Sequence, residues 1–359
     1  MAGVANSALL DLIAVTLPNL DKLTLEVAFA QESYPLCDTM FAPGAVETDS
    51  GKSFERRISL DGAGNAKLYE LYEPMTFNQA ETISLITAQW ARAGVVWGIE
   101  RREVLENSSG SKIYDILKTK RIPAMLDMAD LLEAKLLGCP ADTSDTKTPM
   151  GLQYWIPKIT SAGAGFYGGV PSSSFTNVGG IIPATAGSNT SSITGGKHRW
   201  RSYMAGGTGY YTGVIDNTAV DTLEKAYIKV GFRAPKMLKD NAGAPTNKRK
   251  ILGNTDTLVA MNRRARQQND NVGFDLVAGN AVFKGITPEA VPGLDSDTSN
   301  PIYLVSMNHL KVFALKGDNM REGESMNSRE LPDVFTTPVT CSFQMICLNR
   351  QRQACISAV

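Results

Sequence analysis

The sequence predicts an α+β fold with two lobes, or with one lobe and long excursions. Three observations lead to this fold class. A long amphipathic helix is predicted for residues 111–137. Alternating, half-buried strands are predicted before and after it in the chain, and the clearest spans residues 339–347. The chain of 359 residues also exceeds the length over which one hydrophobic core usually extends.

Charge and cysteine content exclude several classes of protein. Lys plus Arg and Asp plus Glu both total 36, so no net field draws the chain to nucleic acid or to an anionic membrane, and any DNA contact must be local. No run reaches the roughly 18 apolar residues of a membrane helix. The N-terminus lacks the basic start of a secretion signal, so we expect cytoplasmic synthesis. Five cysteines are scattered without a CxxC pair, which favours reduced, packed thiols.

The N-terminal segments are predicted to be extended. Residues 1–47 mix apolar stretches with prolines, which indicates an arm lying on another surface. Residues 52–72 hold two polar-apolar stretches that flank the turn sequence Asp61-Gly62-Ala63-Gly64, and we interpret them as a long hairpin. A two-stranded hairpin with so little apolar surface is marginal in water, so it needs a partner.

The next segment predicts a strand followed by the long helix. Apolar and polar residues alternate over residues 93–99, as in a half-buried strand. Apolar residues then recur at three- and four-residue spacing over 111–137, and Gly138 is the expected stop. Pro123 must kink or divide this helix, because proline removes an amide donor and clashes with the preceding turn.

The second half contains an uncharged insertion and two shorter helices. Residues 159–196 hold no Asp, Glu, Lys or Arg and are rich in Gly, Ser and Thr. We predict a loop-rich insertion, part of which a neighbouring subunit covers, because solvated disordered segments usually carry charge. Helices are predicted for 218–230, with Thr218 and Asp221 arranged like a capping box, and for 255–268.

No motif supports a catalytic, metal or cofactor site. The two histidines, His198 and His309, have no second histidine or cysteine at metal-ligand spacing. The segment Gly163–Gly168 matches GxGxxG, but the following Val-Pro-Ser-Ser-Ser sequence cannot open the helix that would hold a pyrophosphate. We therefore expect no enzyme and no cofactor.

Clustered arginines could pair with phosphates or with carboxylates of a neighbour. For residues 263–266 we favour a solvated helix face, because the neutral chain offers as many acids to pair with them. Trp200, between Arg199 and Arg201, could stack on a base, but an aromatic residue flanked by charges is more often an interface anchor or a partly buried ring. Sequence-specific binding of nucleic acid is not expected.

Several segments, taken in chain order, carry a family resemblance that no single one of them establishes. They are Trp97–Glu103 with 107–117, Gly138 with 149–157, Trp200-Arg201-Ser202, the segments 250–254, 282–286 and 302–304, and finally 339–341 with 348–352. In this order they resemble the tailed-bacteriophage major capsid (major head) proteins of the Hong Kong 97 type fold. The resemblance spans roughly residues 50–355.

The resemblance implies an architecture and a function. The implied parts are an N-terminal arm (1–47), an extended β-hairpin or E-loop (48–78), a peripheral domain with a long spine helix (79–145), an axial domain (146–317), and a return to the peripheral domain with the C-terminal strand (318–359). The chain would self-assemble into hexamers and pentamers of an icosahedral phage head that encloses double-stranded DNA, contacted non-specifically. It would be assembled in the host cytoplasm and reside in the virion. Further implied partners are a separate scaffolding protein, a portal and a decoration protein. No association with a membrane is implied.

The resemblance also directs attention to interface residues. An extended hairpin presents side chains on both faces, so we expect subunit contacts from Phe54, Arg56, Arg57, Lys67 and Tyr69, joined by Trp200 and Arg201. Some members carry a long N-terminal scaffolding region; here the arm starts near Met1, which implies separate scaffolding. Some members crosslink a hairpin lysine to a neighbour's asparagine, but no acceptor or catalytic acid stands out here, so a noncovalent shell is predicted.

Three alternatives remain open at this point. An encapsulin-like bacterial nanocompartment shell shares the fold but loads enzymes as cargo. An adhesive surface protein would suit the Gly/Ser/Thr-rich segment, but it predicts an export signal, and the sequence shows none. The third alternative is an enzyme whose site escapes motif reading.

Overall fold

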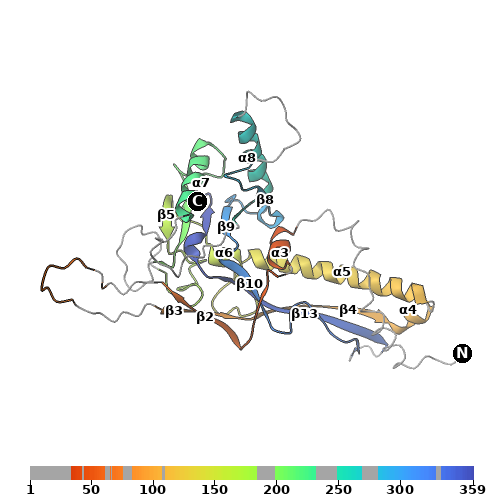
Figure 1. The fold of residues 1–359 in the computed structure, drawn as a ribbon. Helices are drawn as coiled ribbons and strands as arrows, with labels where there is room; N and C mark the ends of the chain where they lie inside the picture. Colours follow the sequence, from red (N-terminus) through yellow and green to blue (C-terminus); the bar gives the residue numbers. More distant parts are fainter. Residues whose placement is uncertain are drawn as a thin grey trace.

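The computed structural model describes residues 34–42, 44–60, 65, 67–75, 83–106, 110–183, 199–231, 249–268, 282–328 and 333–359. It is a mixed helix and sheet fold, as predicted. Figure 1 shows α5 (Gly110–Leu137) lying along the long strands β4 (Ala91–Glu100) and β13 (Val334–Cys347). Helices α7 (Asn217–Val230) and α8 (Thr255–Gln268) lie in the other part of the molecule, near a second sheet. None of the helices in the described ranges is both long and apolar enough to cross a membrane.

The first sheet is organised around β13. β13 pairs antiparallel with β4, with Trp97 opposite Thr337, and also with β10 (Leu310–Leu315), β11 (Arg321–Glu322) and β12 (Met326–Asn327). Strand β1 (Glu47–Asp49) extends the sheet beside β10, and the short helix α4 (Arg101–Glu106) follows β4. The strands predicted at 93–99 and 339–347 are therefore confirmed.

Alternation in β4 determines which of its side chains meet the long helix. Trp97 and Ile99 are buried against Leu117 and Ala124 of α5, while Val96, on the opposite face, is 61% exposed. The predicted long helix is confirmed, and it continues through Pro123 as one element, so the proline does not divide it.

The second sheet has the order β5-β6-β14-β9-β7-β8. Its strands are β5 (Gly163–Tyr167), β6 (Ser202–Gly206), β7 (Arg249–Gly253), β8 (Pro288–Ala290), β9 (Ile302–Ser306) and β14 (Ala354–Ile356). A core cluster joins this sheet to α7 through Leu223, Ala226 and Val230. Most of the GxGxxG match forms strand β5, and the last strand, β14, lies in this second sheet between β6 and β9.

A central core connects the two sheets. It contains α3 (Pro35–Met40), α6 (Leu152–Trp155), the η5 turn (Pro292–Leu294) and the buried ends of α5, β9, β10 and β13. The fully buried Arg350, in the η6 turn (Arg350–Arg352), donates to the carbonyl oxygens of Trp155 (3.0 Å), Gly169 (2.9 Å) and Trp200 (3.3 Å). One guanidinium therefore binds three separate segments, and burial lowers its pKa to about 10.

Two local predictions were wrong. Strand β2 (Ser53–Ser59) pairs with β3 (Ile83–Gln89), with Phe54 opposite Ala88, and not with residues 67–72, which form no strand. The predicted turn at 61–64 lies outside the described residues. The predicted helices at 218–230 and 255–268 are confirmed, but the first begins earlier: its N-cap is Asp216, whose Oδ1 accepts from the Ala219 amide at 2.7 Å, instead of Thr218.

The uncharged segment is partly described. Up to residue 183 it contributes β5 and the buried side chains Phe175, Val178 and Ile181, so this portion packs within its own chain. Residues 184–196 lie outside the described ranges. Coverage of the segment by a neighbouring subunit stays a prediction.

Candidate assembly surface

The β2–β3 ribbon is held to the body at its root. Phe54 is 1% exposed and packs against Phe313 (ring centroids 4.6 Å apart) and Trp90 (6.4 Å). The Trp90 indole Nε1 donates to the Gly51 carbonyl at 3.0 Å. Glu47 of β1 pairs with Lys311 of β10 and, at 3.6 Å, with Arg56 of β2. The apolar and charged contacts of the root together fix where the ribbon leaves the body.

Residues 67–75, which we call the tip, form an ordered turn far from the root. The Lys67 Nζ donates to Glu73 Oε1 (2.8 Å) and to the Pro74 carbonyl (2.9 Å), and the Glu70 amide donates to Glu73 Oε2 (3.0 Å). Hydrogen bonding to Lys67 lowers the pKa of Glu73, which favours the ionised carboxylate. Tyr72 adopts a left-handed conformation with φ 68°, which is uncommon outside glycine.

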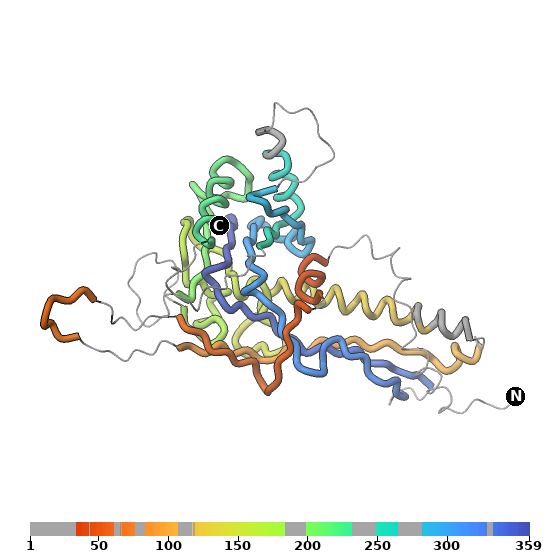
Figure 2. Tube along the Cα trace, viewed as in Figure 1, coloured from red at the N-terminus to blue at the C-terminus, as the bar shows by residue number. Residues whose placement is uncertain are grey.

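The tip carries large apolar side chains that its own chain leaves uncovered. Figure 2 shows this segment standing apart from the rest of the described chain. The exposed fractions are 100% for Leu68, 62% for Tyr69, 85% for Leu71, 95% for Tyr72 and 63% for Met75. Soluble monomers rarely expose clustered apolar side chains of this size, and such clusters mark interaction sites.

The predicted interface residues divide into two groups. Trp200 has no exposed surface, and its Nε1 donates to the Val178 carbonyl at 2.9 Å, so it is a core residue and cannot contact a neighbour. Phe54 and Arg201 (4% exposed) are likewise buried within the chain. The expectation of subunit contacts is corrected for these three residues, because their side chains pack inside their own chain.

Four predicted residues remain accessible. Arg56 and Arg57 are exposed on β2, while Lys67 and Tyr69 lie in the tip. The structure brings the last two together with the apolar residues that sequence reasoning missed, namely Leu68, Leu71, Tyr72 and Met75. The first three lie within residues 52–72 and were assigned to a return strand that does not form, whereas Met75 lies beyond that range.

Chemistry elsewhere in the described chain gives no competing site. Burial raises the pKa of the Cys37, Cys347 and Cys355 thiols to about 12, which keeps them protonated and poorly nucleophilic at neutral pH. Burial lowers the pKa of His309, so it is neutral, while His198 lies outside the described residues. No group of His, Cys, Asp and Glu in the described ranges could hold a metal ion.

A cavity of about 410 Å³ lies beside β3 at the ribbon root. Thr87, Asp142, Asp145 and Tyr154 are among its lining residues, and no His, Cys, Lys or Arg of the described chain lines it. Asp142 accepts hydrogen bonds from Ser144, and Asp145 from the Thr148 amide, so both carboxylates are already engaged in their own loop.

Comparison with known proteins gives the fold a precedent. No protein-family model and no curated protein sequence matches the chain. Solved structures do match over nearly its whole length. The capsid asymmetric unit of cyanophage A-1(L) aligns with TM-score 0.59 at 14% identity, covering 90% of this chain and 92% of that one. The capsid of Myoviridae phage XM1 aligns with TM-score 0.52 at 11% identity, covering 100% of both chains.

A further match comes from a different kind of shell. The holo-SrpI encapsulin complex from Synechococcus elongatus PCC 7942 aligns with TM-score 0.51 at 10% identity, covering 99% of this chain and 96% of that one. At these identities the likeness establishes the fold alone. The chain has the fold of phage capsid proteins, which confirms the resemblance inferred from the sequence.

Proposed function

We propose that this chain is the major capsid protein of a tailed bacteriophage, which assembles with copies of itself into a closed shell. One observation carries the proposal: the β2–β3 ribbon bears an ordered tip whose large apolar side chains are uncovered in the single chain. A second copy of the chain is the partner always present at equal concentration, and contacts that repeat head to tail build rings and closed shells. The fold likeness to capsid proteins over 90% or more of the chain supports this partner.

The finer assembly follows as part of the proposal. The chain forms hexamers and pentamers of an icosahedral head around double-stranded DNA, with a separate scaffolding protein, a portal and a decoration protein as partners. We assign α5 to the spine helix, the β2–β3 ribbon to the E-loop, and the sheet with α7 to the axial domain. With a formal net charge of zero, the inner surface must contact DNA through local basic groups.

The test is negative-stain electron microscopy of the purified full chain, alone and with candidate scaffolding proteins. Closed shells, or isolated hexamers and pentamers, are expected. A chain that stays monomeric with every candidate scaffold, at concentrations where capsid proteins assemble, would refute the assembly function and leave only the fold.

An encapsulin-like shell is the second candidate, because the encapsulin match is as extensive as the phage matches. The contents of native particles separate the two. Double-stranded DNA and a portal would identify a phage head, whereas an enzyme cargo without a portal would identify a nanocompartment.

A further inference from the structure

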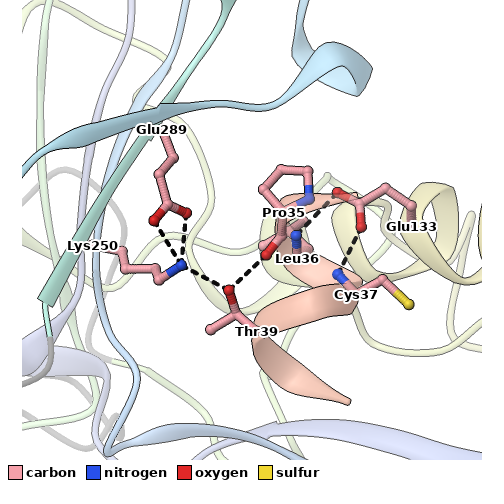
Figure 3. Close-up of polar contacts among 7 residues, drawn as sticks. All are labelled: Pro35, Leu36, Cys37, Thr39, Glu133, Lys250 and Glu289. Carbon is pink, nitrogen blue, oxygen red and sulfur yellow. Dashed lines mark hydrogen bonds and ion pairs between the residues drawn. The ribbon is translucent and has the colours of Figure 1, made fainter. Parts of the chain in front are cut away.

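The six-residue helix α3 occupies a junction between parts of the fold that are far apart in the sequence. Figure 3 shows it between α5 on one side and strands β7 and β8 on the other. Its apolar side chains Leu36 and Met40 are 0% and 3% exposed and belong to the central core. The polar contacts on its two sides are directional. They therefore specify the orientation of α3, which apolar packing alone would not fix.

On the α5 side, one buried carboxylate holds the start of α3. Glu133 is 8% exposed, and it accepts hydrogen bonds from the amides of Leu36 (3.2 Å) and Cys37 (2.7 Å). The first amides of a helix have no partner within it, and the residue before α3, Tyr34, provides no side-chain cap. Glu133 therefore supplies from another helix the cap that α3 lacks. The Tyr34 hydroxyl adds a bond of 2.6 Å to Asp130 of α5.

On the sheet side, a lysine connects α3 to two strands. The Nζ of Lys250, in β7, donates to the Thr39 Oγ1 at 2.7 Å and to both carboxylate oxygens of Glu289, in β8, at 2.8 and 2.6 Å. The Thr39 hydroxyl in turn donates to the Pro35 carbonyl at 2.7 Å. Figure 3 shows these contacts as a continuous path from Glu289 through α3 to Glu133.

The position of α3 has a consequence for the candidate assembly surface. Residues 41–46 lead directly from α3 to β1, where Glu47 contacts both β10 and Arg56 of the ribbon. A shift of α3 against α5 would therefore be passed to the ribbon root through a short connection. The ribbon strand β2 would be displaced with it, because Arg56 of β2 contacts Glu47.

We propose that α3 acts as a clasp, formed with Glu133 and Lys250, that sets the direction of the ribbon and thereby the curvature at which copies join. The inference rests on the proposed shell function and concerns its regulation. A closed shell of one size requires a small, defined set of angles at its repeated contacts, whereas a ribbon with an unrestricted direction also permits sheets, tubes or shells of other diameters.

Two conservative variants of the full chain test the clasp. Thr39→Val removes the hydroxyl that Lys250 binds but keeps the Lys250–Glu289 pair. Glu133→Gln keeps the size of the side chain and removes its charge. Glu106→Gln is the matched control, because Glu106 is a 62% exposed acid whose only ion pair in the described chain, with Arg102, is also solvated.

Hydrogen exchange and electron microscopy give the two measurements. Each variant weakens a hydrogen bond that holds α3, so the amides of residues 36–40 should exchange about tenfold faster or more. Particles assembled under wild-type conditions should then show a broadened diameter distribution or open forms, while the control matches the wild type in both measurements. If Glu133→Gln fails to fold, the milder Thr39→Val decides alone.

Two results would overturn the clasp. One is faster exchange in α3 with particles of unchanged diameter, since the ribbon direction would then not depend on α3. The other is unchanged exchange, since the contacts would then not hold the helix. In both cases the wild type still assembles, which separates failure of the clasp from failure of the proposed function, where the wild type itself forms no shell.

Discussion

Replacing the apolar side chains of the tip should abolish assembly while leaving the fold intact. The variant is Leu68→Ser with Leu71→Ser and Tyr72→Asn, and asparagine is chosen because it tolerates the positive φ of position 72. The three side chains are 100%, 85% and 95% exposed, so almost all of their apolar surface is available to a partner. Their removal should therefore leave the free energy of unfolding of the single chain almost unchanged, and it should greatly weaken the association of copies in the shell.

The magnitude follows from that exposure. Full burial of a large apolar side chain contributes roughly 1.5–3 kcal/mol, so three of them amount to about 4.5–9 kcal/mol if a neighbour covers them completely. Half coverage leaves about 2.3–4.5 kcal/mol for each contact between copies. Since 1.4 kcal/mol is a factor of ten, the dissociation constant of one contact should rise about 40-fold to 1600-fold.

The assay measures assembly and stability on the same preparations. Light scattering against protein concentration gives the threshold for assembly, and thermal unfolding gives the stability of the unassembled chain. We expect the threshold to rise beyond the accessible range and the midpoint of unfolding to stay within a degree or two of the wild type. An unchanged threshold would refute the argument that the tip is an adhesive surface. Val359→Ser, at the exposed C-terminal residue, is the control for loss of an apolar group outside the tip.

Three further predictions concern the core, the cap of α7 and the clasp. All three are measured by urea unfolding. Arg350→Met removes the guanidinium donor from three carbonyl oxygens, those of Trp155 and Trp200 being buried. It should lower the free energy of unfolding by about 3 kcal/mol, partly offset by no longer burying a charge; a loss below 1 kcal/mol would contradict this. Asp216→Ala removes the cap of α7 and should cost about 1 kcal/mol, with Asp216→Asn close to the wild type. Burial and the neighbouring Asp38 raise the pKa of Glu133 although two backbone amides oppose the shift, so protonation favours the folded chain. The free energy of unfolding should therefore fall as pH rises from the ordinary glutamate pKa through the raised value, because the folded chain then buries a charge at Glu133; Glu133→Gln should lack this slope, and an identical pH profile in both proteins would contradict the assignment.

Elements with a strong local pattern were predictable from the sequence. Each of these patterns indicates which side of its element is buried. They are the alternation over β4 and β13 and the three- and four-residue spacing over α5. Pro123 was expected to kink or divide the helix, and it does not divide it. One proline within a long helix that packs along a sheet does not suffice to break the helix in two. The family resemblance, which short segments carry in chain order, indicated the fold without knowledge of any contact.

Long-range pairing could not be derived in the same way. The partner of β2 is β3, which begins at Ile83, and the nearer apolar residues around Leu68 looked equally suitable for a strand. Burial of Phe54 and Trp200 depends on the surfaces that meet them after folding, which no local pattern records. The tip was therefore assigned to a return strand, and the apolar residues that make it a candidate interface were missed.

Polar and apolar groups have different tasks in this chain. Hydrogen bonds and ion pairs at Glu133, Lys250 and Glu47 lie where a direction must be fixed, and their energy depends on distance and angle. Apolar side chains lie at the tip, where surface must be covered, and burial of such surface is non-directional. A shell needs both properties at separate places: adhesion that tolerates small differences between neighbouring sites, and a root that holds one angle. In the proposed shell, adhesion comes from the tip and orientation from the root, so a change at the root should alter the geometry of assembly without altering its strength.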